Sequence, residues 1–350
     1  MKTKIVSIVG ARPNLIKLAA LHPRLRKDFN HIIIHTGQHY DLELSKHFFD
    51  ELDIPEPNYN LHVGSATHGI QTARILSGCE RILLTEKPFT VLVYGDTNST
   101  LGGALAAAKL RIPTVHIESG MRSYDRSMPE EINRVITDHI SSLLLCPSAS
   151  AAKFLKKEGI TKNVFFTGDV MYDIFLKIKP NHLVLKRFNL KPKSYYFATV
   201  HRQENTDNLQ RLRQIFNIFE ALDRPVILPI HPRTRKALSR IKISLKNTKL
   251  VEPVKFSDNI ALEQNSSVIL TDSGGIQKEA YWLRIPCLTL RNTSEWLETV
   301  KSGWNHITDL DSELILKYTT QRVKQSKTHP QYYGKGDSAK KIIDVIKKWL

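Results

Sequence analysis

Residues 91–117 read VLVYGDTNSTLGGALAAAKLRIPTVHI, and this stretch decides the fold class. Val91–Tyr94 is a short apolar run, Thr100–Leu110 is an alanine-rich helical pattern, and Val115–Ile117 is a second apolar run. Apolar runs of this length predict buried strands, and a helix between two of them predicts a βαβ unit. Because strands joined by such a crossover run parallel, the stretch predicts a parallel sheet with helices on both faces.

The same alternation extends in both directions from this stretch. Further strands are predicted at Ile5–Val9, Ile32–His35, Leu143–Cys146, Tyr195–Val200, Val226–Ile230, Leu250–Val254, Val268–Thr271 and Cys287–Leu290. Further helical patterns occur at Glu131–Ile140, Leu209–Leu222 and Gly275–Leu283. Because 350 residues are too many for one compact core, the pattern predicts an α/β protein with two Rossmann-like, doubly wound domains.

The apolar pattern weakens around residues 170–193, a region rich in Lys and Pro, and this region is the predicted hinge. We therefore place the N-terminal domain at residues 1–168 and the C-terminal domain at residues 169–335. The last helical stretch, residues 336–350, is long enough to return and pack on the N-terminal domain. Ligands of such sheets bind outside the carboxyl ends of the strands, and here we also expect them between the domains.

The chain is strongly basic, with 51 Lys and Arg residues against 34 Asp and Glu residues and a formal net charge of +17. The basic residues are spread along the chain, so an anionic small substrate explains the charge better than nucleic acid does. Three single cysteines show no metal-ligand spacing, and no metal site is expected. Neither a membrane-length apolar run nor a signal peptide is recognisable, so a cytoplasmic protein is expected.

Polar side chains follow the predicted strands of the N-terminal domain. Arg12 and Lys17 come after the first strand, near a helix N-terminus that favours anions. Asp96 follows another strand, where it fits either a helix N-cap or a carboxylate in a cleft. Glu118 ends a third buried strand, a position that favours a catalytic role over a surface role.

Glu130 lies at the start of a helical pattern and has two explanations. Ser127 and Glu130 fit the S-x-x-E capping box, and Glu130 and Arg134 are spaced as an i,i+4 surface pair. These structural roles account for the motif by themselves. Only the occurrence of Glu130 together with Asp96 and Glu118 indicates that Glu130 is a third carboxylate of an active site.

The C-terminal domain carries polar residues at its own strand ends. His201 and His231 end two successive strands, where an imidazole can transfer a proton or stabilise a phosphate. The turn Ser273–Gly275 lies between a strand and a helix, which predicts a phosphate cradle of amides and a hydroxyl. Glu279, one turn into that helix, can accept hydrogen bonds from ribose hydroxyls. The dinucleotide fingerprint GxGxxG is absent after the first strand, and no redox cofactor is expected.

Read together and in this order, these segments resemble the non-hydrolysing UDP-N-acetylglucosamine 2-epimerase family. The resemblance spans nearly the whole chain through GARPNLIK (10–17), HTGQH (35–39), YGDTNST (94–100), HIESGMRS (116–123), MPEEINR (128–134), HRQEN (201–205), HPRT (231–234) and LTDSGGIQKEA (270–280). The family has the glycosyltransferase-B architecture, two Rossmann-like domains around a cleft. That architecture agrees with the fold predicted from the periodicity.

The resemblance implies a role for each matched residue. The catalytic residues that it implies are three acid–base carboxylates and a histidine that stabilises the leaving diphosphate: Asp96, Glu118, Glu130 and His201. The residues that it implies for binding UDP are Arg12, Lys17, His231, Ser273, Gly274, Gly275 and Glu279. Gln38 and His39 match a loop that in some members helps to bind a second, activating UDP-sugar.

Two positions depart from the family pattern. Many members carry Arg-Pro-Glu where this chain has Asn14 as the third residue, so a carboxylate near the cleft is missing. Many also carry Thr-Glu-Arg-Pro-Glu where this chain has Trp296 in place of the arginine, so we expect a cation beside the nucleotide to be lost. Both departures bear on how the sugar and the nucleotide are bound, and so on sugar specificity and activation, more than on the type of reaction.

The resemblance implies an enzyme without cofactor or metal that interconverts UDP-N-acetylglucosamine and UDP-N-acetylmannosamine for surface polysaccharide synthesis. Because the C2 hydrogen is not acidic, the chemistry proposed for the family eliminates UDP to give 2-acetamidoglucal and then adds it back. The family habit implies a homodimer, and no nucleic-acid or membrane partner is expected. The alternatives are a 2-epimerase of a modified UDP-sugar such as a UDP-diacetamido-uronic acid, a hydrolysing epimerase, and a glycosyltransferase of the same architecture.

Overall fold

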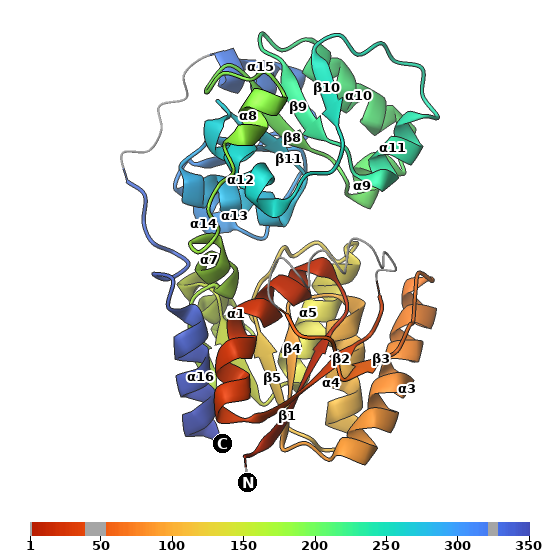
Figure 1. The fold of residues 1–350 in the computed structure, drawn as a ribbon, viewed down its shortest axis with the longest axis vertical. Coiled ribbons are helices and arrows are strands. Elements are labelled where there is room, and N and C mark those ends of the chain that lie inside the picture. Colours follow the sequence, from red (N-terminus) through yellow and green to blue (C-terminus); the bar gives the residue numbers. More distant parts are fainter. Residues whose placement is uncertain (1, 39–53, 321–327) are drawn as a thin grey trace. The chain divides into compact units, whose positions relative to one another are not determined.

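The computed structural model describes residues 2–38, 54–320 and 328–350, which form two compact units (Figure 1). Unit 1 comprises Met1–Lys177 and Gln331–Leu350, and unit 2 comprises Ile178–Pro330. The chain leaves unit 1 later than the predicted boundary after residue 168. The reason is that helix α7 (Val170–Phe175) packs against α1 (Arg12–Asp28) and α16 (Ser338–Trp349) of the same unit.

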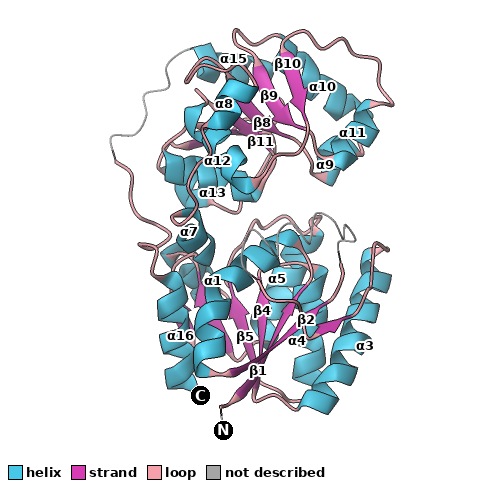
Figure 2. Ribbon diagram, viewed as in Figure 1, coloured by secondary structure: helices cyan, strands magenta, loops and turns pink. Residues whose placement is uncertain are grey.

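Unit 1 is built on a parallel sheet with the strand order β3-β2-β1-β4-β5-β6-β7. Its strands are β1 (Lys4–Val9), β2 (Asn30–His35), β3 (Tyr59–Asn60), β4 (Thr90–Tyr94), β5 (Thr114–Ile117), β6 (Leu143–Cys146) and β7 (Val164–Phe166). Its helices, besides α1, α7 and α16, are α3 (His68–Glu86), α4 (Asn98–Lys109), α5 (Pro129–Ile140) and α6 (Ala149–Lys157). Figure 2 shows helices on both faces of this sheet.

Unit 2 is built on a second parallel sheet with the order β10-β9-β8-β11-β12-β13. Its strands are β8 (Tyr196–Thr199), β9 (Val226–Pro229), β10 (Thr248–Val251), β11 (Ile269–Thr271), β12 (Cys287–Thr289) and β13 (Asn305–Ile307). Its helices are α8 (Leu183–Arg187), α9 (Gln203–Thr206), α10 (Leu209–Glu220), α11 (Pro232–Leu238), α12 (Phe256–Asn265), α13 (Gly274–Leu283), α14 (Leu297–Lys301) and α15 (Ser312–Thr320).

Both faces of the unit 2 sheet are buried, and strand β8 shows why its sequence is continuously apolar. Tyr196 and Ala198 belong to one hydrophobic cluster, whereas Tyr195 and Phe197 belong to another. Successive side chains of a strand point to opposite faces, so a strand covered on both faces must be apolar throughout. The strands β7 and β13 were not predicted: β7 is apolar throughout but only three residues long, and β13 has one apolar residue of three.

One predicted strand lies in a different place from the observed one. Residues 250–254 were expected to form a strand, but β10 spans Thr248–Val251 and pairs with β9 from Thr248 onward. Pro253 lacks the N–H that would extend the ladder, so the pairing ends before it.

A chain of polar side chains crosses the interior of unit 1. His22 Nδ1 lies 3.1 Å from His31 Nδ1, and His31 Nε2 lies 2.8 Å from Ser7 Oγ. Ser7 Oγ in turn lies 2.6 Å from the hydroxyl oxygen of Tyr94. This chain satisfies polar groups that would otherwise be costly to bury.

Acid is expected to destabilise unit 1 through His31. Burial, together with the neighbouring His22, lowers the pKa of His31 from 6.5 to about 3. Below pH 6.5 the unfolded chain therefore binds a proton at His31 that the folded chain does not bind. The stability is present above that pH and is lost as the pH falls, by about 2 kcal/mol in the free energy of unfolding at about pH 5.

Urea unfolding at several pH values between about 7 and 5 measures this loss. The variant His31→Asn has no titrating ring at this position, so its stability should fall less steeply with acid than that of the parent chain. Parallel pH profiles for the two proteins would show that His31 does not carry the effect.

Candidate active site

Four of the predicted site residues follow the strands at which the strand order of each sheet reverses, whereas Glu118 follows the neighbouring strand β5 and His231 the neighbouring strand β9. The order of strands reverses between β1 and β4 in unit 1 and between β8 and β11 in unit 2. Doubly wound sheets bind ligands outside the carboxyl ends of the strands at such switch points. Arg12 follows β1, Asp96 follows β4, His201 follows β8 and Ser273 follows β11. Each unit thus carries its own group of candidate site residues.

Glu118 ends strand β5 and forms an ion pair with Lys17 of α1. Lys17 Nζ donates to Glu118 Oε1 at 2.6 Å, and the two side chains are only 4% and 11% exposed. The backbone of Glu118 is left-handed, with φ = 70°. This conformation is uncommon for residues other than glycine and clusters at functional sites. Lys17, for which the resemblance implies a contact with UDP, therefore lies against the carboxylate implied for catalysis.

Asp96 does not cap helix α4, which was the competing explanation of this residue. The N-cap is Thr97, whose hydroxyl accepts a hydrogen bond from the backbone N–H of Thr100. The Asp96 carboxylate instead accepts from Nη2 of Arg134 on α5, and its side chain is 32% exposed. Its carboxylate is therefore oriented by a residue from another element and keeps access to solvent.

Glu130 lies in the first turn of α5 and is half-buried. The predicted capping box is wrong, because the N-cap is Met128 and makes no side-chain capping bond. Ser127 turns away and donates its hydroxyl to Asp125 Oδ1 at 2.6 Å. Arg134, predicted as a surface partner of Glu130, is buried and donates to Glu131 Oε2 at 3.0 Å. The structural explanations of Glu130 thus lose most of their support.

Helix α5 directs its charged residues inward, which is a feature the sequence analysis missed. Glu131, Arg134 and Asp138 are each no more than 3% exposed, whereas Ile132 and Ile136 are 47% and 38% exposed. The inward residues are spaced i, i+3 and i+7, so they share one face of the helix. This inverted amphipathic pattern was the available signal for Arg134 and its neighbours.

Asp138 anchors a buried network beneath the turns that carry Asp96 and Glu118. It accepts from Arg122 Nη1 at 2.6 Å and from the backbone N–H of Gly120 at 3.1 Å. His116 places Nδ1 2.7 Å from Asp138 Oδ1 and Nε2 2.7 Å from the carbonyl oxygen of Gly95. Burial alone would raise the pKa of Asp138, but His116 and Arg122 outweigh it and hold that pKa below its usual value. The network therefore fixes the backbone just before Asp96, at Gly95, and on both sides of Glu118, at His116 and Gly120.

Asn14 ties the start of α1 to the end of β4. Its Oδ1 accepts from the backbone N–H of Ala11 at 3.1 Å and from the hydroxyl of Thr97 at 3.1 Å. Its Nδ2 donates to the carbonyl oxygen of Tyr94 at 2.7 Å. An ionised glutamate has no N–H to donate and could not make this last bond. Asn14 therefore replaces the glutamate of the Arg-Pro-Glu pattern with a side chain that both accepts and donates hydrogen bonds.

Gln38 is buried and attached to the start of α4. Its Oε1 accepts from the backbone N–H of Ser99 at 2.9 Å and from the Ser99 hydroxyl at 2.6 Å. Its partner in the predicted activation loop, His39, lies outside the described residues. The binding of a second UDP-sugar by these two residues remains a prediction.

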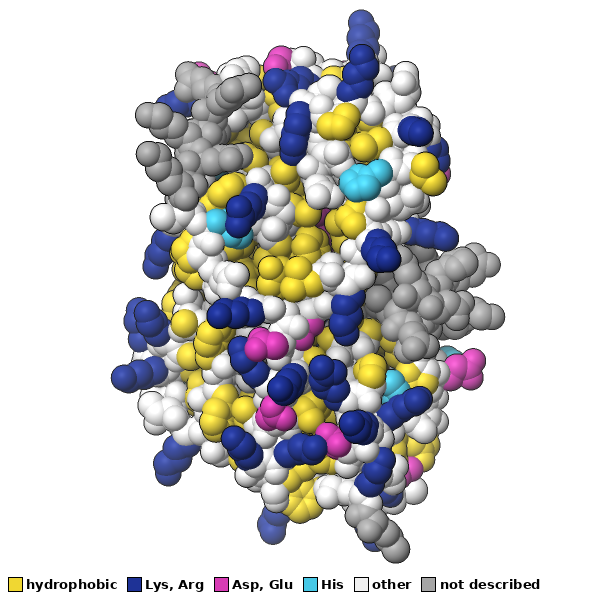
Figure 3. Space-filling model, turned by 60° about the vertical axis from the view of Figure 1, so that its left-hand side comes forward, with side chains coloured by type: hydrophobic (Ala, Val, Ile, Leu, Met, Phe, Trp, Pro, Cys, Tyr) yellow, Lys and Arg dark blue, Asp and Glu magenta, His cyan; other side chains and the backbone are white. Residues whose placement is uncertain are grey.

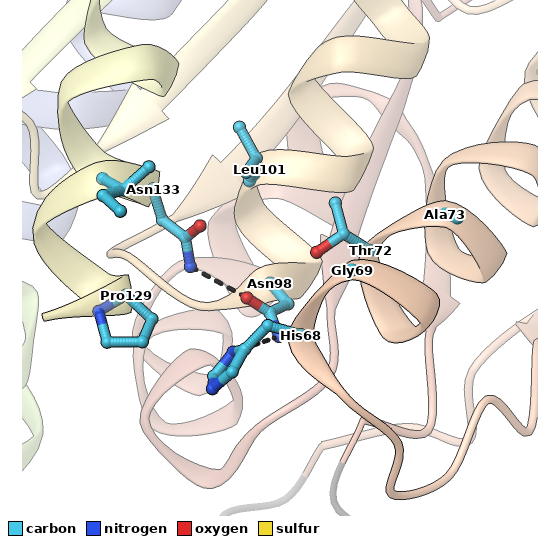
Figure 4. Close-up of a pocket in the computed structure, with 9 residues that line it drawn as sticks. His68, Gly69, Thr72, Ala73, Asn98, Leu101, Pro129 and Asn133 are labelled. Atoms are coloured by element: carbon cyan, nitrogen blue, oxygen red, sulfur yellow. Dashed lines mark hydrogen bonds between the residues drawn. The ribbon is translucent and has the colours of Figure 1, made fainter.

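A cavity of about 430 Å³ lies between α3, α4 and α5 on unit 1 (Figure 4). Asn98 links its walls, because Asn133 Nδ2 donates to Asn98 Oδ1 at 3.0 Å and Asn98 Nδ2 lies 3.1 Å from His68 Nδ1. The remaining lining is mostly apolar and includes Leu101 and the exposed Ile132. None of the predicted site residues lines this cavity.

In unit 2, Asp272 organises the turn that carries His201. Its carboxylate is fully buried and accepts from the backbone N–H groups of His201 and Arg202, both at 3.0 Å, and from Asn205 Nδ2 at 3.1 Å. The ring of His201 lies 5.6 Å from the ring of His231, centroid to centroid. The two histidines at successive strand ends are therefore neighbours, and Asp272 is a supporting residue that the motif itself contained.

The turn predicted to cradle a phosphate begins helix α13. Ser273 is the N-cap and makes no side-chain capping bond, and Gly274 and Gly275 are the first two helical residues. Among the described residues a Cβ on Gly275 would meet only Ser273 Oγ, at 3.8 Å, so the space on the side-chain side of this glycine is open. A helix N-terminus with bare amides attracts anionic groups. Glu279 follows one turn later and is 5% exposed.

Trp296 stands where many relatives carry arginine, yet a cation is present. Lys278 is 1% exposed, and its Nζ lies 4.2 Å from the centroid of the Trp296 ring, a cation–π contact. Trp296 borders the cradle, because a Cβ on Gly274 would lie 3.2 Å from Trp296 Nε1. Lys278 thus places a positive charge beside Trp296, from the neighbouring helix. The loss of a cation beside the nucleotide stays a prediction.

Lys and Arg side chains are spread over the whole face shown in Figure 3. Within the described part of the chain, no group of three His, Cys, Asp or Glu residues is placed to hold a metal ion. The helices of this part include none with the length and apolar character needed to cross a membrane.

Comparison with known proteins places this arrangement in a family. The model of the UDP-N-acetylglucosamine 2-epimerase family matches residues 23–347. A protein of Methanococcus maripaludis, described as a UDP-N-acetylglucosamine 2-epimerase homolog, is 51% identical and covers 98% of this chain and 99% of its own. The UDP-2,3-diacetamido-2,3-dideoxy-D-glucuronate 2-epimerase of Pseudomonas aeruginosa is 40% identical and covers 99% of each chain.

A solved structure shares the whole architecture. The crystal structure of Methanocaldococcus jannaschii UDP-GlcNAc 2-epimerase in complex with UDP-GlcNAc and UDP is 42% identical, with a TM-score of 0.92 over 99% of this chain and 100% of that chain. The predicted fold class, two Rossmann-like domains of the glycosyltransferase-B type, is confirmed. The relatives are isomerases that act on UDP-sugars, and this chain belongs to the UDP-N-acetylglucosamine 2-epimerase family.

Proposed function

We propose that this enzyme interconverts UDP-N-acetylglucosamine and UDP-N-acetylmannosamine by eliminating UDP and adding it back, without hydrolysis. The observation that carries the proposal is a pair of oriented carboxylates after two neighbouring strands of unit 1, Asp96 after β4 and Glu118 after β5. Glu118 is held by Lys17, and Asp96 is held by Arg134. Acid–base groups that are fixed in place in this way suit proton removal and return at a weakly acidic carbon.

Residues of unit 1 transfer the proton at C2, and residues of unit 2 stabilise the leaving diphosphate. In the forward direction a carboxylate of the set Asp96, Glu118 and Glu130 takes the C2 proton while the bond from C1 to the UDP oxygen breaks. Amides of the turn Ser273–Gly275, together with His201, stabilise the charge on the departing diphosphate. A carboxylate on the other face of the ring then returns a proton to C2 of the glycal, and UDP re-forms its bond to C1.

Incubation with UDP-N-acetylglucosamine in D₂O tests this proposal. The expected result is deuterium at C2 of both epimers and an approach to equilibrium from either side. Retention of the C2 hydrogen would refute the elimination. Accumulation of free N-acetylmannosamine and UDP would identify a hydrolysing enzyme, and an absolute need for an acceptor would identify a glycosyltransferase.

A diacetamido-uronic acid sugar on UDP is the second candidate substrate. The 40% identical relative from Pseudomonas aeruginosa is a 2-epimerase of such a sugar. The net charge of +17 also suits a substrate with an additional carboxylate. Comparing kcat/KM for the two sugars decides between them, and a preference for the uronic acid would replace the first candidate.

Gly95→Ala is expected to damage the enzyme more than Gly64→Ala. Both glycines have positive φ, 66° and 68°, so an added Cβ costs about 1 kcal/mol of strain at either position. A Cβ at Gly95 would lie 2.7 Å from Lys17 Nζ and 3.3 Å from Glu118 Oε1, whereas at Gly64 it would meet none of the described residues within 4 Å. Thermal unfolding should show a similar loss of stability in both variants, but only Gly95→Ala should lose turnover. Equal turnover would mean that the ion pair is not part of the site.

The enzyme is also proposed to act as a cytoplasmic homodimer that supplies a polysaccharide precursor. The exposed Ile132 and Ile136 on α5, beside the largely apolar cavity of unit 1, support a surface that a second copy covers.

The double change Ile132→Asp and Ile136→Asp is expected to give a monomer in light scattering, because burying two carboxylates opposes association. A matched change of exposed Leu84 to Asp on α3 should leave the mass unchanged, and a parent chain that is already monomeric would rule out the dimer.

A further inference from the structure

We propose that Glu263 is a positioning residue that donates a hydrogen bond from its protonated carboxyl group to Glu279 and so holds Glu279 for the ribose of UDP. Nothing in the family motifs points to Glu263, which lies on α12 outside every matched segment. The inference rests on the proposed function, because only that function makes Glu279 a ligand of a ribose.

The two glutamates meet inside unit 2, where α12 packs against α13. Glu263 is 0% exposed and Glu279 is 5% exposed, and their side chains are hydrogen bonded to each other. Asn259, one turn earlier on α12, donates from Nδ2 to Glu263 Oε1. Glu263 Oε2 is buried and receives no donor from the described residues. One oxygen of Glu263 is thus occupied by an amide, and the carboxyl group faces a second carboxyl group.

Two adjacent buried carboxylates cannot both be ionised at neutral pH, so the pair shares a proton. The other titratable groups that face Glu263 are Tyr195, next to β8, and Cys287 on β12. Burial raises the pKa of both the Tyr195 hydroxyl and the Cys287 thiol, so neither carries charge at neutral pH. Among the described residues, no Lys or Arg compensates a charge on Glu263.

The proton of the pair belongs on Glu263. Burial, followed by the charge of Glu279 and the hydrogen bond to it, raises the pKa of Glu263 well above its usual value. Glu279 is the more exposed of the two, at 5% against 0% for Glu263, and keeps the negative charge that accepts hydrogen bonds from ribose hydroxyls best. A protonated Glu263 is therefore the donor that orients Glu279, and loss of this proton at high pH sets two carboxylates against each other.

Binding measurements on two variants and two ligands test the inference. Glu263→Met removes the donor but fills a similar volume, whereas Glu263→Gln keeps an N–H for Glu279 and an oxygen for Asn259. The probes are UDP and its 2′,3′-dideoxy analogue, measured by calorimetry with the full chain. We expect Glu263→Met to weaken UDP about tenfold and to leave the dideoxy analogue unchanged. Glu263→Gln should restore UDP binding to the level of the parent chain.

A pH series supplies a readout that a merely structural role would not change. As the pH rises, UDP affinity of the parent chain should fall more steeply than that of Glu263→Gln, which has no proton to lose at this position. Equal UDP affinity in Glu263→Met, an equal loss for both ligands, or parallel pH profiles would overturn the role of Glu263. Failure of the parent chain itself to bind UDP would instead refute the proposed function.

Discussion

Glu118→Gln is expected to lower the turnover number about a thousandfold while the protein remains folded and binds UDP. An amide has the shape of the carboxylate but cannot take a proton from C2, and general acid–base groups contribute on this scale. Glu118 already contacts Lys17 at 2.6 Å and has a left-handed backbone conformation. The substitution therefore removes the charge of a carboxylate that is held in one orientation. Steady-state epimerisation and deuterium exchange at C2 measure the loss.

Glu86→Gln is the matched control for this experiment. Glu86 accepts from Lys4 Nζ at 2.9 Å, and its side chain is 16% exposed against 11% for Glu118, so the two glutamates are similarly buried, although Lys4 is more exposed than Lys17. It ends helix α3, and Lys4 begins strand β1, at the edge of the sheet opposite the strand carboxyl ends. Its variant should turn over at the rate of the parent chain. A Glu118→Gln enzyme with more than about a tenth of the parent activity would exclude Glu118 as an acid–base group.

Gly275→Val is expected to weaken UDP binding about a hundredfold without unfolding unit 2. The side chain would occupy the open space over the first turn of α13, where the diphosphate must approach the amides. Several charge-assisted hydrogen bonds are lost together, which accounts for the size of the effect. Calorimetric titration with UDP measures the affinity, and thermal unfolding without ligand checks the fold.

Gly69→Val provides the same change at a matched position. Gly69 is the second residue of helix α3, as Gly275 is of α13, and no atom of the part of the chain that the structure describes lies within 4 Å of a Cβ there. Both variants therefore introduce a valine in a first helical turn with free space around it. If Gly275→Val bound UDP as tightly as Gly69→Val, the turn Ser273–Gly275 would not be the diphosphate cradle.

The strands and their alternation with helices were predictable because a strand that is buried on both faces of a parallel sheet is a continuous apolar run in the sequence. The run Val91–Tyr94 and the helix that follows it are enough to specify a βαβ unit. The motifs at the strand ends were visible for the same reason, since polar residues stand out directly after apolar runs. Strand Leu143–Cys146 was even predicted with its observed bounds.

The roles of side chains at helix starts could not be read from the sequence. Asp96 and Thr97 are both good N-caps, and Ser127 with Glu130 satisfies a capping box, yet Thr97 and Met128 are the observed N-caps. The backbone angles at each helix start and the partner that a side chain reaches settle this choice. For Asp96 that partner is Arg134, which lies 38 positions away in the sequence.

The sequence by itself determined the α/β fold class, the two Rossmann-like units and the family, because periodicity and ordered motifs are local patterns. Only the tertiary structure decided how the charged groups are paired. It placed Lys17 against Glu118, Lys278 against Trp296, and Glu263 beside Glu279. Ion pairs and shared protons depend on distances of a few ångströms between residues that are remote along the chain, and no local pattern records those distances.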